Sequence, residues 1–256
     1  MTQPNYPQPP VPVDHTEPVP RRIRAVLAGR TVVDTTAARY VWEWPPYPQY
    51  YLPLADVADG VLVDEGQTED SSRGTGHRHG LAVGDVTRPA AALVYPDSTV
   101  DGLAGTVRVD WDAVDAWYEE DEEVFVHPHN PFSRVDAVRS SRTLRVESQG
   151  VVLAESQSPV MVFETGLPTR YYVNRTDVHF DHLVPSATVT ACPYKGRTTA
   201  YWSADVGGRA HPDIAWCYDF PTAQVLPIAG LVAFYDEKVD TFLDGVRLDR
   251  PTTHFS

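Results

Sequence analysis

The sequence predicts an all-β protein that contains two copies of one structural unit. Three observations support this: a long segment that repeats without gaps, many short runs of β-branched and aromatic residues, and no extended helical pattern. A chain of 256 residues is long enough for one large domain or two of ordinary size. The repeat favours the second arrangement, with two β units in tandem.

The repeat is visible in two separate blocks. "AGRTVVDTTAARYVWEWPPYPQYYLPLADV" aligns with "QGVVLAESQSPVMVFETGLPTRYYVNRTDV" at an offset of 121 residues, so that Glu43 matches Glu164 (164 − 43 = 121). "LAGTVRVDWDAVDAW" then aligns with "IAGLVAFYDEKVDTF" at an offset of 125. Two blocks in almost the same register indicate an internal duplication, with one short insertion in the second copy.

Each copy is expected to be a series of short strands. In the second copy, "LRVESQGVVLAES" alternates about a Gln-Gly pair, which is typical of a β-hairpin. Later runs are rich in β-branched and aromatic residues and are interrupted by Gly, Pro or Asp. These runs cover residues 160–164, 170–173, 188–192, 199–206, 213–218, 230–235 and 239–243. Residues 177–183 are expected to form at most one helical turn.

The segments outside the repeats are rich in proline. Seven of the first twenty residues are prolines, and we expect residues 1–21 to form a disordered or polyproline-like tail. The two copies are then expected at residues 22–126 and 143–250. The polar segment between them, residues 127–142, is expected to be a linker.

The overall charge excludes some partners. The net charge is −14, with acidic clusters at "DEGQTED" and "WYEEDEE", so the chain should repel nucleic acid. No run of about 18 apolar residues is present, and the N-terminus lacks the pattern of a signal peptide. We therefore expect a cytoplasmic protein, a monomer or a homodimer, with no membrane partner and with reduced Cys192 and Cys217.

The second copy resembles a bacterial family known as domain of unknown function 427. The resemblance rests on "GVVLAES", "FETGLPTRYYV", "CPYKG", "AYW", "AW" and "PIAGLVAFY", in that order, and covers residues 143–248. It implies a β-tent fold, similar in shape to methionine sulfoxide reductase B and the ligand-binding domain of cereblon. Many β-tent proteins hold a structural zinc through two cysteine pairs, but this chain has no Cys-x-x-Cys, so no structural zinc or other cofactor is expected.

The same motifs indicate the candidate site. From the chemistry of the residues at the matching positions, the catalytic candidates are Lys195, Glu164, Asp177, Cys192 and Tyr201, and the ligand-binding candidates are Arg170, Tyr171, Tyr194, Trp202 and Trp216. A guanidinium and an ammonium near aromatic rings suit a small anionic or polar ligand with a planar part. We therefore expect Arg170 and Lys195 to point into one pocket.

Three interpretations of Cys192 are open. A nucleophile would need a lowered pKa, which the nearby Lys195 could provide, and normally a base. A metal ligand would need further ligands. A small thiol in the wall of a pocket needs neither, and this is the favoured interpretation.

The first copy serves as an internal comparison. Gln49 stands at the position of Arg170, and aligning Gly80 with Gly196 places His79 at the position of Lys195 and Gly76 at that of Cys192. On this alignment the reactive residues are missing from the first copy. We therefore expect one functional site, in the second copy.

The expected function is that of a small-molecule binding protein or of an enzyme, with one site in the second copy. The alternatives are a structural or partner-binding protein, and a nucleotidyltransferase, a label attached to the family. No phosphate-binding loop or Asp-x-Asp pair supports that label. The pairs His77/His79 and His127/His129 have the spacing of metal ligands on a strand, but further ligands are not evident, and surface histidines are the simpler interpretation.

Overall fold

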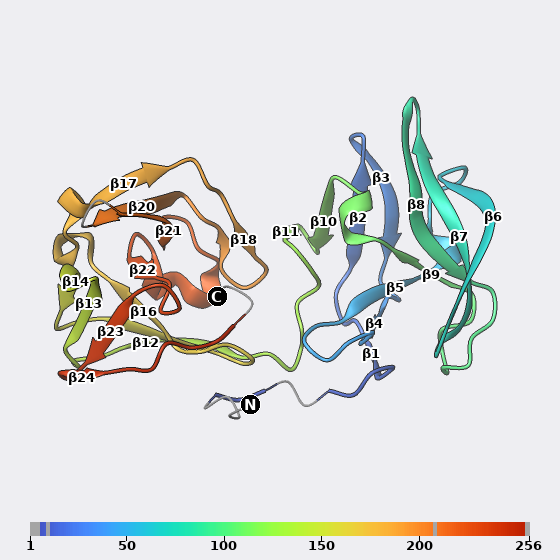
Figure 1. Cartoon of the computed structure of the whole chain (residues 1–256). Coiled ribbons are helices and arrows are strands. Elements are labelled where there is room, and N and C mark those ends of the chain that lie inside the picture. The colour runs from blue at the N-terminus through green and yellow to red at the C-terminus, as the bar shows by residue number, and fades with distance from the viewer. Residues whose placement is uncertain (1–5, 9–10, 207–208, 254–256) are drawn as a thin grey trace. The chain divides into compact units, whose positions relative to one another are not determined.

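The computed structural model describes residues 6–8, 11–206 and 209–253. These residues form two compact units (Figure 1). The N-terminal unit contains residues 11–131, and the C-terminal unit contains residues 132–253 together with residues 6–8. Both consist of antiparallel strands and short 3₁₀ turns, which confirms the all-β class. None of the helices in the described ranges is long and apolar enough to span a membrane.

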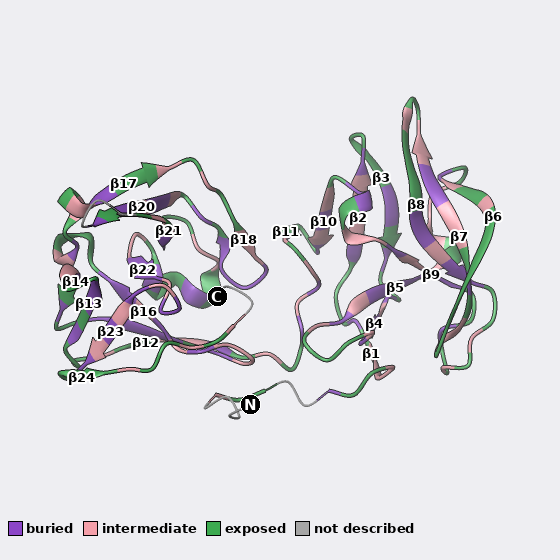
Figure 2. Cartoon of the chain, in the orientation of Figure 1, coloured by how far each residue is buried: buried purple, intermediate pink, exposed green. Residues whose placement is uncertain are grey.

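The N-terminal unit contains a large and a small sheet. The large sheet has the strand order β1-β4-β5-β9-β8-β7-β6 and the small one β11-β10-β2-β3. The strands are β1 Thr16–Pro18, β2 Ile23–Leu27, β3 Arg30–Thr35, β4 Arg39–Val41, β5 Gln49–Pro53, β6 Leu62–Ser71, β7 Gly74–Val83, β8 Val86–Tyr95, β9 Thr106–Val109, β10 Ala116–Glu119 and β11 Glu122–Val124. The 3₁₀ turns are η1 Leu54–Asp56 and η2 Trp111–Ala113. The edge strand β6 is almost entirely exposed (Figure 2).

The C-terminal unit has the same plan. Its large sheet has the order β12-β15-β16-β22-β21-β20-β17, its small sheet β14-β13-β23-β24, and β18 and β19 form a separate hairpin. The strands are β12 Val135–Arg139, β13 Leu144–Ser148, β14 Val151–Ser156, β15 Val160–Glu164, β16 Arg170–Val173, β17 Leu183–Ser186, β18 Ala191–Cys192, β19 Gly196–Arg197, β20 Ala200–Val206, β21 Arg209–Cys217, β22 Val232–Phe234, β23 Asp240–Leu243 and β24 Val246–Arg247. The 3₁₀ turns are η3 Arg175–Asp177, η4 Phe180–His182 and η5 Ala223–Ile228.

The first hairpin of each unit has the same tight turn at the matching position of the repeat. Strands β2 and β3 are joined by Ala28-Gly29, and β13 and β14 by Gln149-Gly150; all four residues have positive φ. Two consecutive positive φ angles define the tight hairpin turn that matches the twist of the strands, and glycine adopts the second at no steric cost. The hairpin expected from the Gln-Gly pair is confirmed.

Two expected boundaries are wrong. Thr16–Pro18 pairs with β4, and Val11 and Val19 are buried, so the expected tail over residues 1–21 extends too far. Val135–Arg139, expected in the linker, pairs with β15 as the matching edge strand of the second unit. The strand Thr16–Pro18 was missed because it contains a proline, and Val135–Arg139 because it contains polar residues; an edge strand tolerates both. Residues 1–5 and 9–10 of the expected tail lie outside the described residues.

Each large sheet has two different faces. The inner face packs on the small sheet and forms the main core of the unit. The opposite side, called the outer face below, carries a separate buried cluster in each unit. In the C-terminal unit, Val225 and Ile228 of η5 belong to this cluster, so η5 and the loops beside it cover the outer face.

Candidate functional site

The hairpin β18–β19 places Lys195 on the outer face of the C-terminal unit. Cys192 pairs with Gly196, whose φ of 90° favours glycine, and the turn between them carries Lys195. Thr222 fixes this turn, because its Oγ1 donates a hydrogen bond to the carbonyl oxygen of Tyr194 at 2.5 Å. Lys195 is 7% exposed, and its ammonium group donates to the carboxylate of Glu164 at the end of β15, which is 8% exposed. Lys195 and Glu164, both candidate site residues from the sequence, thus form a buried ion pair.

The electrostatic environment of Cys192 disfavours a nucleophile. Burial raises the pKa of the thiol, and the charge of Lys195, whose Nζ is 3.8 Å from the sulfur, does not reverse this. Burial alone would lower the pKa of Lys195, but the ion pair with Glu164 holds it above its ordinary value. The ammonium therefore stays charged and the thiol stays protonated at neutral pH, which supports a role for Cys192 as part of the wall.

Arg170 is held by two carboxylates that the sequence analysis did not single out. Its Nη1 and Nη2 atoms lie 2.7 Å and 2.6 Å from the two carboxylate oxygens of Glu237, and Nη1 is 3.2 Å from Asp236. Burial raises the pKa of Asp236 to about 6, against the opposing charge of Arg170. One guanidinium thus faces two carboxylates, and Arg170 is paired within the protein. This differs from the expectation that Arg170 binds an anionic group of a ligand.

Aromatic rings connect the two ionic groups. Trp216 on β21 lies 4.3 Å from Tyr235, measured between ring centroids, and its indole nitrogen donates to the hydroxyl of Tyr172 at 3.3 Å. Tyr201 on β20 exchanges a hydrogen bond with Tyr235 at 2.9 Å. The guanidinium carbon of Arg170 lies 5.9 Å from the Trp216 ring and 5.7 Å from that of Tyr235. The site is therefore a continuous layer of rings with an ion pair at either end.

We call this set the outer-face site. Its members are Glu164, Arg170, Tyr172, Cys192, Tyr194, Lys195, Tyr201, Trp216, Tyr235, Asp236 and Glu237. Tyr194 joins it as a buried ring of the same apolar cluster. Tyr235, Asp236 and Glu237 follow β22, and their order in the sequence gave no sign that they would face Arg170.

Two expected wall residues lie on the opposite side of the sheet. Tyr171 and Trp202 pack with the inner core, because consecutive residues of a strand point to opposite faces and their neighbours Tyr172 and Tyr201 point outward. The expectation that they line the same pocket as Lys195 is wrong.

Asp177 also has a different role from the one expected. Its carboxylate accepts a hydrogen bond from the hydroxyl of Ser156 at 2.6 Å, joining η3 to the end of β14. In the first unit, Asp56 accepts the same bond from Thr35, also at 2.6 Å. A contact present in both units indicates a structural clamp, not a catalytic base.

The first unit matches the second differently from the sequence alignment. His77 pairs with Val94 as Ala200 pairs with Cys217, an offset of 123 residues for both partners. The alignment of Gly80 with Gly196 is therefore wrong, and Lys195 corresponds to the turn between β6 and β7.

That turn carries Arg73, which takes the place of Lys195. Its Nη2 lies 4.0 Å from Glu43, the counterpart of Glu164, and its Nη1 lies 2.7 Å from Asp14. Arg108 on β9 is 2.9 Å from Glu43, and the hydroxyl of Tyr51 donates to it at 2.8 Å. The first unit thus keeps the glutamate and supplies cations from other positions, whereas we expected the charged residues to be missing.

The histidine pairs do not form a metal site. His127 stacks on Tyr47 with ring centroids 3.8 Å apart, and His129 bonds to Glu119 at 2.9 Å. The Nδ1 atom of His79 lies 2.9 Å from the carbonyl oxygen of His77. In the described ranges, no group of three or more His, Cys, Asp or Glu side chains is arranged to hold a metal ion.

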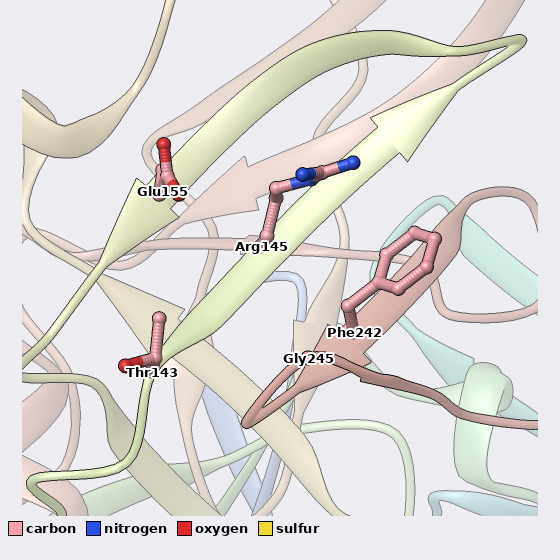
Figure 3. Close-up of a pocket in the computed structure, with 5 residues that line it drawn as sticks. All are labelled: Thr143, Arg145, Glu155, Phe242 and Gly245. Carbon is pink, nitrogen blue, oxygen red and sulfur yellow. The ribbon is translucent and has the colours of Figure 1, made fainter.

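A second surface feature lies on the small sheet of the C-terminal unit. A depression of about 250 Å³ is lined by Thr143, Arg145, Glu155, Phe242 and Gly245. In Figure 3, the side chain of Arg145 lies between those of Glu155 on β14 and Phe242 on β23. The guanidinium of Arg145 lies 5.1 Å from the Phe242 ring, and Arg24 lies 5.4 Å from the Tyr118 ring in the matching position of the first unit. Because the stacked pair occurs in both units, we interpret it as a support of the small sheet.

The protein is thus an all-β protein made of two similar two-sheet units. The outer face of each large sheet carries ionic residues and buried aromatic residues. Comparison with family profiles matches residues 15–120 and 136–245 separately to the domain of unknown function DUF427. The chain belongs to this family and contains two copies of its domain. A search of curated proteins gives no match.

Proposed function

We propose that the C-terminal unit binds a small, polar, partly planar molecule at the outer-face site. The observation that carries this proposal is the buried Lys195–Glu164 pair beside the layer of Trp216, Tyr201 and Tyr235. Burying an ion pair is not an efficient way to stabilise a fold, since apolar residues of similar volume are often as good or better. Its position beside aromatic rings supports a role in recognition.

The charges of the site indicate the kind of ligand. Arg170 and Lys195 are matched by Glu164, Asp236 and Glu237, so with all five groups ionised the net charge is −1. A neutral or weakly cationic ligand fits this balance better than an anion. Its planar part would stack on the rings, and its polar groups would bond to Lys195 and Glu164.

The outer-face site also has groups that could catalyse a reaction of the bound molecule. Lys195 could donate and Glu164 accept a hydrogen bond at the reacting group, with Tyr201 assisting, but Asp177 and a thiolate of Cys192 have no part in it. We further propose that the protein works in the cytoplasm on a small molecule, without nucleic acid or membrane, as a monomer or homodimer.

The test is a screen of planar polar compounds, such as nucleobases and heterocyclic amides, followed by ligand-observed NMR and thermal shift. For a compound that binds, Lys195→Met and Glu164→Gln should weaken binding by about one to two decades, the loss expected for a charge-assisted hydrogen bond. Arg73→Met, at the matching turn of the first unit, is the control and should leave the affinity unchanged. Equal losses from Arg73→Met and Lys195→Met would contradict the proposal.

A further inference from the structure

We infer that residues 249–253 form a strap that closes the outer-face site and regulates access to it. The inference rests on the proposed function, because it concerns entry to the same site. It starts from the way the chain continues after β24, where it leaves the small sheet and reaches back to the residues that hold Arg170.

The strap is attached at its two ends. At its start, Arg250 donates from Nε and Nη2 to one carboxylate oxygen of Asp240 on β23, at 3.1 Å and 2.8 Å. At its end, the hydroxyl of Thr253 donates to Oε1 of Glu237 at 2.6 Å. Between them, Pro251 is half-buried and Thr252 is exposed, so few apolar contacts hold the middle of the strap.

Glu237 connects the strap to the site. The same oxygen, Oε1, accepts hydrogen bonds from Thr253 and from Nη2 of Arg170, and the glutamate side chain has 0% exposure. Burial alone would raise the pKa of Glu237, but the hydrogen bonds from Arg170 and Thr253 lower it below its ordinary value. Releasing Thr253 therefore removes a bond from the carboxylate that fixes Arg170 over Trp216 and Tyr235.

The arginine to which the strap is linked through Glu237 is buried. Arg170 is only 5% exposed although it is the first residue of a strand, where the chain enters the sheet from a loop. In the first unit, the position matching Glu237 at the offset of 125 is Asp112 in η2, which is exposed. The buried carboxylate that accepts the hydrogen bond from the strap is thus specific to the C-terminal unit. A hydroxyl–carboxylate bond and one ion pair with a partly exposed arginine are weak enough to open reversibly.

The test measures the exchange of the Arg170 guanidinium protons with water by ¹⁵N-edited NMR on the full chain. Thr253→Val keeps the shape of the side chain but removes the donor, and a chain ending at Arg250 removes the rest of the strap. Both should accelerate exchange about tenfold or more, since a charge-assisted hydrogen bond of this kind is lost. Thr253→Ser restores the donor and should exchange like the unmodified protein.

Two results separate the strap from its alternatives. The guanidinium protons of Arg108, which lie in the ion-pair network of the first unit, should exchange at one rate in all four proteins. If Thr253→Val and the shortened chain exchange at Arg170 like the unmodified protein, the strap is disproved. The exchange measurement needs no ligand, so it tests the strap independently of the proposed function. A compound screen that finds no binder would count against the proposed function, and the exchange rates alone would still confirm or disprove the strap.

Discussion

At the residue scale, the arrangement of the outer-face site follows from the ion-pair partner of each buried charged residue. Glu164 meets Lys195, while Glu43, at the matching position of the first unit, meets Arg73 and Arg108. The glutamate is common to both units, but the cations come from different places in the chain. A buried carboxylate is costly without a cation beside it. The packing of each unit decides which position in the chain supplies that cation.

The Lys195–Glu164 pair leads to a first prediction. Lys195→Met should reduce the free energy of unfolding by about 3–5 kcal/mol, because it leaves Glu164 buried without its partner. The double variant Lys195→Met/Glu164→Leu should be more stable than the single one, since no uncompensated charge remains. Urea denaturation of the three proteins measures this, and a double variant less stable than the single one would contradict it.

Glu119 in the first unit leads to a second prediction, on pH. Burial alone would raise the pKa of this carboxyl, but hydrogen bonds from His129 and Tyr50 and the charge of Arg21 hold it at about 2. The ordinary value is 4.5, so the folded pKa is lowered and the group stabilises the fold above that value. This stabilisation, about 3 kcal/mol, should be lost as the pH falls from about 4.5 to 2.

The measurement is the stability of the full chain and of Glu119→Gln between pH 2 and 7. The variant should be less stable at pH 7 and should lose less stability on acidification. Parallel pH profiles for the two proteins would show that other carboxylates cause the acid sensitivity.

At the element scale, the alternation of each strand decides which aromatic rings reach the site. Tyr171 and Tyr172 are adjacent, as are Tyr201 and Trp202, yet one of each pair faces the inner core and the other the site. The family motifs mark all four residues without separating them. The two faces differ because the small sheet covers only one of them.

The Asp–hydroxyl clamps give a third prediction, which concerns the junction of a strand and a 3₁₀ turn. Asp177→Ala and Asp56→Ala should each reduce the free energy of unfolding by about 1–3 kcal/mol, because Ser156 and Thr35 lose the same bond. Asp181→Ala is the control, since that side chain is 77% exposed and should contribute little. Calorimetry measures the stabilities, and a loss of ligand binding from Asp177→Ala without a loss of stability would restore its catalytic assignment.

At the scale of the whole molecule, the charge is divided unequally between the units. Residues 10–131 contain 9 basic and 21 acidic residues, a net charge of −12, and the rest of the chain contains 12 basic and 14 acidic residues, a net charge of −2. The acidic character of the protein thus belongs to the first unit. Arg170 and Lys195 stand in this nearly neutral unit, so their positive charge is not isolated in an acidic environment.

A fourth prediction concerns metal. The chain has no cysteine pair, and no metal-binding group is present in the described part of it. We therefore expect much less than one zinc per chain by elemental analysis, and the same thermal unfolding with and without a strong chelator. About one zinc per chain, with unfolding on chelation, would contradict this expectation.

The sequence by itself determined the duplication, the β class and the hairpin around Gln149-Gly150 in the second unit. These follow from local patterns: alternation, turn residues and a repeat in register. Only the tertiary structure decided that Arg170 pairs with Asp236 and Glu237, 66 and 67 residues further along the chain. It also decided that Arg73 replaces Lys195 in the first unit. Such contacts depend on which strands become neighbours and on how loops cover a sheet, and local patterns do not encode the pairing of distant segments.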